Sequence, residues 1–355
     1  MSTETDRTRA TIIDVSRRAK VSVGTVSRVL NNKGPVSERA IRAVNQAIRE
    51  LDYRPNTVAQ SLRRNQTRVI GCLVPDIVNP VFSKLVKGAE EALLAAGYII
   101  LVATSGSRTD KELEILKLFE ERQVDGLMLS IVDERNEGVA KALRQADVPI
   151  VSLDRDLPVP CDAVRYAHAE SMVAAINHLF GLGHNRIALI TGGYEISVTR
   201  ERIAGYRQAF RQAGRPVDED LIRTGSVDER HGYEQGIALL SRSDPPTALI
   251  AGANQLLVGV MRAMREIGLA MGPDVSVISC DDTILSELAT PAVTVISRDI
   301  DEYGRTAAEL LLARLLRETR ADQESANRAP YRTTLPWQFI IRDSCVAISS
   351  HAPAG

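Results

Sequence analysis

One face of a short helix near the start of the chain carries the residue types that proteins use to contact DNA. These outward side chains are small, hydrogen-bonding or cationic: Gly24, Thr25, Ser27, Arg28 and Asn31. Such groups are suited to the base edges and phosphates of a DNA major groove. An ordinary helical hairpin with a solvated polar face gives a similar pattern, and this stretch alone does not decide between the two.

Two helices joined by a tight corner are predicted to position these side chains. In the first helix, apolar residues recur at helical spacing, at Ile12, Val15 and Ala19. Ser22 stands where an N-cap belongs, so the second helix is expected to start at Val23, after a corner at Lys20-Val21. The inner face of the second helix carries Val26, Val29 and Leu30.

A third helix is predicted to complete this part of the chain, with Ser37 as its cap. Its apolar stripe consists of Ile41, Val44, Ile48 and Leu51. The sequence therefore predicts a three-helix head of the helix-turn-helix type over residues 11–52. Residues 1–10 are expected to form a disordered tail, and residues 53–66 a hinge that is too short to hold a helix alone in water.

The head is basic and the rest of the chain is acidic. Residues 1–66 contain 13 Lys+Arg and 6 Asp+Glu, whereas the following 289 residues contain 31 and 39. The head can neutralise phosphates and release counterions, and the acidic part is repelled by them. Double-stranded DNA is therefore expected to contact the head alone. Chance clustering of charges would not explain why the helix pair lies in the basic part.

Beyond residue 66 the pattern changes to apolar runs separated by helical segments. The runs cover residues 69–74, 99–103, 126–131, 150–153, 187–190, 248–251 and 275–278. Continuous apolar runs are expected of parallel strands that are covered on both faces. The predicted fold class is α/β and doubly wound over residues 67–345, followed by a tail at 346–355. So many strands favour two lobes with a ligand cleft between them over one large sheet.

Other functions are less well supported by the residue pattern. Asp281 and Asp282 could serve an enzyme as an acid/base pair, with a partner among His168, His178 and His184. No nucleophile motif, phosphate loop or metal-ligand spacing accompanies them, so no enzyme and no cofactor is expected. The four cysteines are far apart and form no CxxC pair, which predicts neither a metal site nor a disulfide framework.

The apolar runs are too short to span a bilayer, and the start of the sequence has no apolar signal region. We therefore expect a cytoplasmic protein without membrane contacts, associated with the bacterial nucleoid when bound to DNA. A stand-alone solute-binding protein is an alternative that would explain the two lobes. It would not explain the basic head, and it would need an export signal.

Several segments, in one order along the chain, resemble the lactose and galactose repressor (LacI/GalR) family of transcription regulators. They include TIIDVSRRAKVSVGTVSRVLN, YRPNTVAQSLRR, GLGHNRIALITG, RERIAGYRQAF and PAVTVISRDIDEYGRTAAELLL. The matching segments cover nearly all of the chain. The resemblance implies a body like that of periplasmic sugar-binding proteins, a homodimer, a palindromic operator and repression of transcription under the control of a small-molecule effector.

The resemblance also implies roles for residues of the head. Val23, Gly24 and Arg28 occupy positions that read bases, and Arg28 could fork onto a guanine. Contacts with phosphate are implied for Ser22, Thr25 and Asn31. Gly24 departs from the pattern, because glycine offers no side chain to a base edge and costs a helix interior up to about 1 kcal/mol relative to alanine. A tolerated surface glycine is the alternative.

The segment from Asn56 to Arg64 resembles a family hinge that becomes helical on the operator, in pairs across the dimer. Leu62 would wedge between base steps from the minor groove and bend the DNA, while Arg63 and Arg64 face phosphate. A small contact between Leu62 and the body is the alternative interpretation.

In the cleft, the resemblance implies effector contacts for Arg202 on one lobe and Asp281 on the cleft wall. The two are expected to project from separate strand ends and to bracket the vicinal hydroxyls of a carbohydrate-like effector. Further contacts are implied for Phe82, Asp154 and Asn254. Alternatively, Asp281-Asp282 is a strand-end turn and Phe82 belongs to the core. Ala253 stands where many family members place a ligand-contacting asparagine, which argues against an ordinary hexose.

Overall fold

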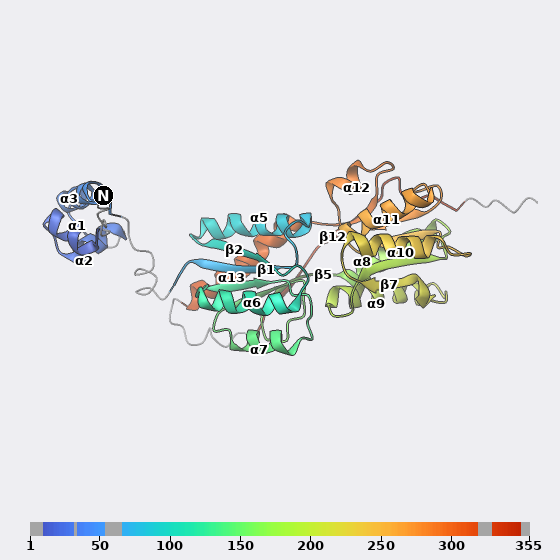
Figure 1. Cartoon of the computed structure of the whole chain (residues 1–355), viewed down its shortest axis with the longest axis horizontal. Coiled ribbons are helices and arrows are strands. Elements are labelled where there is room, and N and C mark those ends of the chain that lie inside the picture. Colours follow the sequence, from blue (N-terminus) through green and yellow to red (C-terminus); the bar gives the residue numbers. More distant parts are fainter. Residues whose placement is uncertain (1–9, 32–33, 54–65, 319–328, 349–355) are drawn as a thin grey trace, which may run out of the picture. The chain divides into compact units, whose positions relative to one another are not determined.

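The computed structural model describes residues 10–31, 34–53, 66–318 and 329–348 (Figure 1). The chain divides into two compact units, residues 1–67 and residues 68–355, which are called the head and the body below. The predicted DNA contacts Asn56, Leu62 and Arg63 lie outside the described residues, as do residues 1–9 of the predicted tail. Within the described ranges, no helix combines the length and the apolar character that a membrane span requires.

The described part of the head contains three helices packed around a small apolar core. They are α1 (Ile12–Ala19), α2 (Val23–Leu30) and α3 (Glu38–Glu50). The buried core residues are Val15, Val26, Val44, Ala47 and Tyr53. Ile41, which was expected in the apolar stripe of α3, is 37% exposed, because three short helices enclose an interior too small for every apolar side chain.

The N-terminal lobe of the body is a parallel six-stranded sheet with helices on both faces. In spatial order its strands are β11 (Arg332–Leu335), β5 (Asp162–Tyr166), β4 (Ile150–Leu153), β3 (Gly126–Leu129), β1 (Val69–Val74) and β2 (Ile99–Thr104). Its helices are α5 (Pro80–Ala95), α6 (Thr109–Glu121), α7 (Glu137–Gln145) and α13 (Ile300–Glu318). The direction of winding reverses between β1 and β3, which is a topological switch point.

The C-terminal lobe repeats this strand order in a second sheet. Its strands are β12 (Trp337–Ile340), β10 (Thr294–Arg298), β9 (Ser276–Ser279), β8 (Ala248–Ala251), β6 (Ile187–Gly192) and β7 (Ile222–Gly225). Its helices are α8 (His168–Gly181), α9 (Ser197–Gln212), α10 (Glu229–Leu240), α11 (Asn254–Ile267) and the short α12 (Ile284–Leu288) and η1 (Glu219–Leu221). The switch point here lies between β6 and β8, and β12 runs antiparallel to β10.

Each sheet has apolar side chains on both faces, as covered parallel strands require. In β1, Ile70, Cys72 and Val74 belong to the cluster beneath α5 and α13, whereas Leu73 belongs to the cluster beneath α6 and α7. The β2 strand differs from the expectation, because it lies at the sheet edge and Ile99 is 58% exposed.

The chain crosses between the lobes three times. The first crossing joins β5 to α8, the second joins β10 to α13, and the third joins β11 to β12. These crossings place the ends of β5 and β10 between the lobes, where side chains from both halves of the body meet.

The doubly wound α/β body with two lobes and the three-helix head are confirmed. The strands β5, β7 and β10 were not predicted, because their sequences lack a continuous apolar run. Residues 346–348, which were predicted to belong to a C-terminal tail, contact the body. The Val346 carbonyl oxygen accepts a hydrogen bond from His184 Nε2 at 3.0 Å, and the Ile348 N–H donates to the Leu182 carbonyl oxygen at 2.9 Å, so residues 346–348 pack on the body.

Candidate functional site

The start of α2 is fixed by a cap and by the corner before it. Lys20 has a left-handed backbone with φ of 54°, and the Val21 N–H donates to the Ser16 carbonyl oxygen at 3.1 Å. The Ser22 hydroxyl accepts a hydrogen bond from the Thr25 N–H at 3.1 Å, as an N-cap does. The predicted corner, cap and first residue of α2 are confirmed.

The outward face of α2 offers one cation and several short polar groups. Ser22, Gly24 and Arg28 are exposed, and the half-buried positions are Val23, Thr25, Ser27 and Asn31. Arg28 Nε donates to the Gly24 carbonyl oxygen at 3.3 Å, and Asn31 Nδ2 donates to the Ser27 carbonyl oxygen at 2.7 Å. Among the described residues, the two Nη groups of Arg28 have no partner, so both can donate to an external acceptor.

Gly24 has space for a larger side chain. A Cβ atom built on it would lie 3.7 Å from Ser22 Oγ, which is an ordinary contact, and its φ is not in the left-handed region. No contact in the described part of the head therefore requires glycine here.

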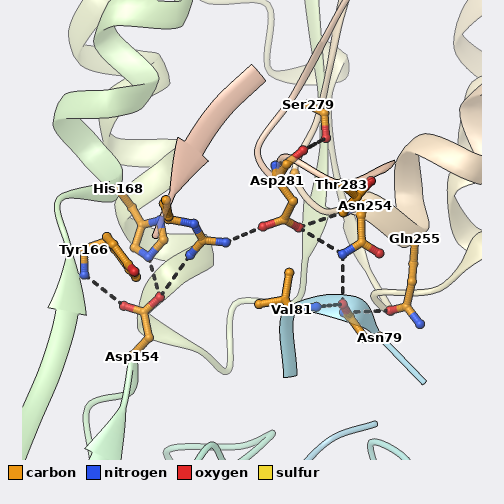
Figure 2. Close-up of polar contacts among 12 residues, drawn as sticks. Asn79, Val81, Asp154, Tyr166, His168, Asn254, Gln255, Ser279, Asp281 and Thr283 are labelled. Atoms are coloured by element: carbon orange, nitrogen blue, oxygen red, sulfur yellow. Dashed lines mark hydrogen bonds and ion pairs between the residues drawn. The ribbon is translucent and has the colours of Figure 1, made fainter. Parts of the chain in front are cut away.

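In the body, polar side chains from both lobes meet at the carboxyl ends of the strands (Figure 2). Asp154 follows β4 in the N-terminal lobe, and Asp281 follows β9 in the C-terminal lobe. Arg298 is the last residue of β10, at the second crossing between the lobes. This edge is where doubly wound sheets usually hold ligands.

Arg298 binds one carboxylate from each lobe. Its Nη2 donates to Asp281 Oδ1, and its Nη1 lies 3.6 Å from Asp154 Oδ2. The guanidinium carbon lies 5.0 Å from the centroid of the Tyr166 ring. The Arg298 side chain is 9% exposed, and although burial alone would lower its pKa, the charges of Asp281 and Asp154 raise that pKa above the ordinary value. An ion-pair triad therefore joins the two lobes.

Asp154 has two further donors. His168 Nε2 lies 2.7 Å from Asp154 Oδ2, and the Tyr166 N–H donates to Asp154 Oδ1 at 3.4 Å. Burial lowers the pKa of His168 to about 4, so its ring is neutral at pH 7 and donates through Nε2. Burial alone would raise the pKa of Asp154, but the contact with His168 and the charge of Arg298 hold it well below its usual range. Asp154 is therefore ionised.

Arg202 differs in position from the expectation. It lies on α9 and not at a strand end, and it belongs to the same lobe as Asp281. The residue is 8% exposed, and its Nη1 donates to the carbonyl oxygen of Gly252, which follows β8. Because α9 begins shortly after β6 ends, its first turns lie at the carboxyl edge of the sheet, which brings this guanidinium to the end of β8.

Asn254 connects the lobes through side-chain amides. Its N–H donates to Asp281 Oδ2 at 2.9 Å, and its Nδ2 donates to Asn79 Oδ1, in the opposite lobe, at 2.8 Å. Gln255 Nε2 donates to Asp76 Oδ2 at 3.3 Å, again across the lobes. Asn79 also caps α5, since its Oδ1 accepts from the Val81 N–H. The structure thus brings Asp154, Asn254 and Asp281 into one connected network.

The Phe82 side chain makes no polar or ring contact with this network among the described residues, although its backbone N–H donates to the Asn79 carbonyl oxygen at 3.0 Å. It is half-buried on α5 and packs against the core beneath α5 and α13. This placement favours the core interpretation of its spacing with Leu85.

A second set of contacts joins the lobes at Glu134. This residue follows β3 in the N-terminal lobe, and its side chain is 3% exposed. Its Oε1 accepts from the Ser197 N–H at 2.9 Å and from the Ser197 hydroxyl at 2.7 Å, at the start of α9. Its Oε2 accepts from Arg200 Nη2 at 2.6 Å. The N-cap position of α9, Ile196, provides no side-chain cap, so Glu134 fills that role from the other lobe.

Sequence reasoning missed Asn79, Glu134 and Arg298 in this region, and it named His168 only as a partner in the enzyme alternative. Asn79 had a usable signal, because asparagine before proline marks a helix start. Arg298 ends a strand that was not predicted, and Glu134 lies in a loop whose partner is 63 residues away, so no local pattern indicated either. In the described part of the chain, no three His, Cys, Asp or Glu side chains are grouped closely enough to hold a metal ion.

The matches to known proteins agree with the division of the chain into a head and a body. Residues 11–56 match the model of bacterial regulatory proteins of the lacI family, and residues 176–345 match a periplasmic binding protein-like domain. The ribose operon repressor of Escherichia coli (strain K12) is 34% identical over 318 residues, which are 88% of this chain and 96% of the relative. The HTH-type transcriptional regulator DegA of Bacillus subtilis (strain 168) is 31% identical over 339 residues, or 95% of this chain and 98% of the relative.

A solved structure of similar architecture is that of the lac repressor dimer bound to operator and the anti-inducer ONPF. It matches with a TM-score of 0.81 and 28% identity, covering 96% of this chain and 100% of that one. These relatives are transcription regulators and not enzymes, which sets aside the acid/base interpretation of Asp281 and Asp282. From the head model and the relatives matched over nearly its full length, the chain belongs to the lacI family of bacterial regulatory proteins.

Proposed function

We propose that a small molecule bound between the lobes controls the affinity of this transcriptional repressor for its operator. The observation that carries the proposal is the polar network that spans both lobes, in which Arg298 contacts Asp154 on one side and Asp281 on the other. A ligand that replaces these contacts between the lobes, or makes further contacts with both lobes, changes the free energy of lobe closure. Ligand and operator affinities are then coupled reciprocally, with about 1 to 3 kcal/mol as a typical size.

The chemistry of the network suits a hydroxylated effector. Carboxylates accept hydrogen bonds from hydroxyl groups, and the guanidinium of Arg202 donates to oxygen. We therefore propose a carbohydrate-like compound that contacts Arg202, Asp281, Asp154 and Asn254. One relative is named the ribose operon repressor, and ribose is a carbohydrate, which supports a compound of this general class.

On the DNA side, we propose that two heads bind a palindromic operator as a homodimer. A single head presents one short helix, which gives limited contact, and a two-fold pair doubles it. The lac repressor structure, a dimer bound to operator, supports this arrangement. In each head, Val23, Gly24 and Arg28 are assigned to bases, and the phosphate contacts are assigned to Ser22, Thr25 and Asn31, with Ser27 on the same outward face. In the hinge, which begins at Asn56, Leu62 is assigned to the minor groove and Arg63 to phosphate.

We expect Arg28→Ala to weaken operator binding by about 1 to 3 kcal/mol and to relax the preference at one base pair. The reason is that the Nη groups of Arg28 have no partner among the described residues and are the only cationic donors on the described outward face of α2. Fluorescence anisotropy with the operator and with random DNA measures the difference. Arg42→Ala is the matched control, because Arg42 is an exposed arginine on α3. Equal losses on both DNAs for Arg28→Ala would contradict the assignment to a base.

We expect Asp281→Ala to abolish the response of operator affinity to the effector. Asp281 holds both Arg298 and the Asn254 N–H, so its loss disconnects the C-terminal lobe from the network. The measurement titrates sugars and sugar acids against operator-bound protein and records the change in operator affinity. Asp274→Ala is the control, because among the described residues that carboxylate accepts only from the Ala270 N–H, in a surface loop. A normal response in Asp281→Ala would remove this network as the effector site.

A further inference from the structure

The charge of Arg202 lacks a counter-ion in the described part of the body. Arg202 is 8% exposed, and its one hydrogen bond goes to the neutral Gly252 carbonyl oxygen. No described carboxylate oxygen lies within 4.0 Å of its guanidinium nitrogens. A buried cation without a partner is costly, and such groups are usually paired or bound to a ligand.

The two carboxylates of the network are already occupied. Arg298 binds Asp281 and Asp154 together, and Asp281 Oδ2 also accepts from the Asn254 N–H. Asp154 accepts in addition from His168. Neither acid is therefore free to neutralise Arg202, and each retains only part of its capacity to accept hydrogen bonds from a ligand.

Arg202 and Arg298 point their charges at the same region. Burial is the main cause that lowers the pKa of His168, and the charges of both arginines lower it further. The same two charges oppose the effect of burial on the Cys280 thiol, next to Asp281. The charges of both guanidiniums therefore act on the region between His168, at the first crossing, and Cys280, which follows β9.

We propose that the effector carries an acidic group, a carboxylate or a phosphate ester on a polyol, and that this group pairs with Arg202. The inference rests on the proposed effector site and specifies its ligand. A planar guanidinium with free N–H groups matches an oxyanion through two parallel hydrogen bonds. The hydroxyl groups of the same molecule donate to the unused lone pairs of Asp281 and Asp154.

The test is calorimetric titration of the full-length protein with matched compounds. D-Glucose is compared with D-glucuronate, D-gluconate and D-glucose 6-phosphate, and D-galactose with D-galacturonate. We expect at least one acid to bind about 100-fold more tightly than its neutral counterpart, because a charge-assisted pair in a buried site is strong. The carboxylates and the phosphate ester separate the two kinds of acidic group.

Variants of α9 locate the acidic group. Arg202→Gln should weaken binding of the acid by about 30-fold or more and binding of the neutral sugar by much less, and Arg202→Lys should recover part of the loss by keeping the charge. Arg207→Gln is the matched control, since Arg207 lies on the same helix and pairs with Glu219 at the surface. Unchanged thermal midpoints and operator binding without ligand show that the variants are folded.

Two outcomes overturn the acidic class: a neutral sugar that binds as tightly as its acid, or no binding by any of the acids. In the first of these outcomes, the proposed control by an effector still stands if the neutral sugar changes the operator affinity. Acid binding that Arg202→Gln does not weaken also overturns the pairing with Arg202. Failure of the proposed function looks different, because acids would then bind in the body without any change in operator affinity.

Discussion

Replacing Arg298 by methionine should destabilise the body by about 3 to 5 kcal/mol at pH 7.5, the cost expected when one partner of a buried ion pair is removed. Asp154 and Asp281 are 7% and 6% exposed, and the variant leaves both without their shared cation. Methionine keeps a long apolar stem, so loss of packing is small. The midpoint of urea unfolding measures the effect.

The pH dependence of this loss follows from the pKa of Asp154. In the wild type that pKa is lowered on folding, so the group stabilises the native state above the unfolded pKa, and this contribution is lost as the pH falls. Without Arg298 one cause of the lowering disappears, so the pKa of Asp154 in the folded variant lies above that in the wild type. The difference between wild type and Arg298→Met should therefore shrink from pH 8 towards pH 4, as protonation relieves the buried acid.

Arg305→Met is the matched control. Arg305 lies on α13, seven residues further along, and pairs with Glu302 at the surface, where both side chains are more than 40% exposed. Exposed ion pairs contribute about 0 to 1 kcal/mol, so this control should change little. Equal destabilisation by the two variants, or a loss that grows as the pH falls, would contradict the triad as a stabilising link between the lobes.

The sequence was sufficient for features that depend on neighbouring residues. Ser22 and Val23 were placed correctly because an N-cap and the first helical turn lie next to one another in the chain. The same holds for β1 and β4, whose apolar runs match their observed bounds. Strands such as β5 and β10 mix polar and apolar residues, since their ends carry functional side chains between the lobes, and periodicity alone did not reveal them.

The candidate site was predictable only where the resemblance to a family supplied positions. Asp154, Asn254 and Asp281 were named in this way, and the structure connects them. The resemblance could not indicate that Arg298 binds Asp154 and Asp281 together. The two ion pairs join residues 144 and 17 positions apart in the chain, and Arg298 lies where the chain crosses between the lobes. The lobe of Arg202 was also beyond the sequence, since assigning it requires the strand order of the second sheet.

Removing the carboxylate of Glu134 should loosen the two lobes. Glu134→Ala deletes the bonds to Ser197 and Arg200 in the opposite lobe and leaves the start of α9 without a cap. Hydrogen bonds to a charged group contribute about 1.5 to 3 kcal/mol, and 1.4 kcal/mol is a factor of about 10 in an equilibrium. We expect the population of the closed arrangement to fall by about 10- to 100-fold relative to the open one.

Small-angle scattering of the ligand-free protein and calorimetry with a bound effector measure this change. The variant should show a larger radius of gyration and weaker effector affinity, because part of the binding energy must then close the lobes. Glu134→Gln keeps an acceptor without the charge and should fall between the wild type and alanine. Glu137→Ala is the control, since Glu137 is a nearby carboxylate that is 90% exposed. If Glu134→Ala had the same scattering curve and effector affinity as Glu137→Ala, Glu134 would be a local helix cap without influence on lobe closure, and coupling would depend on the Arg298 triad alone.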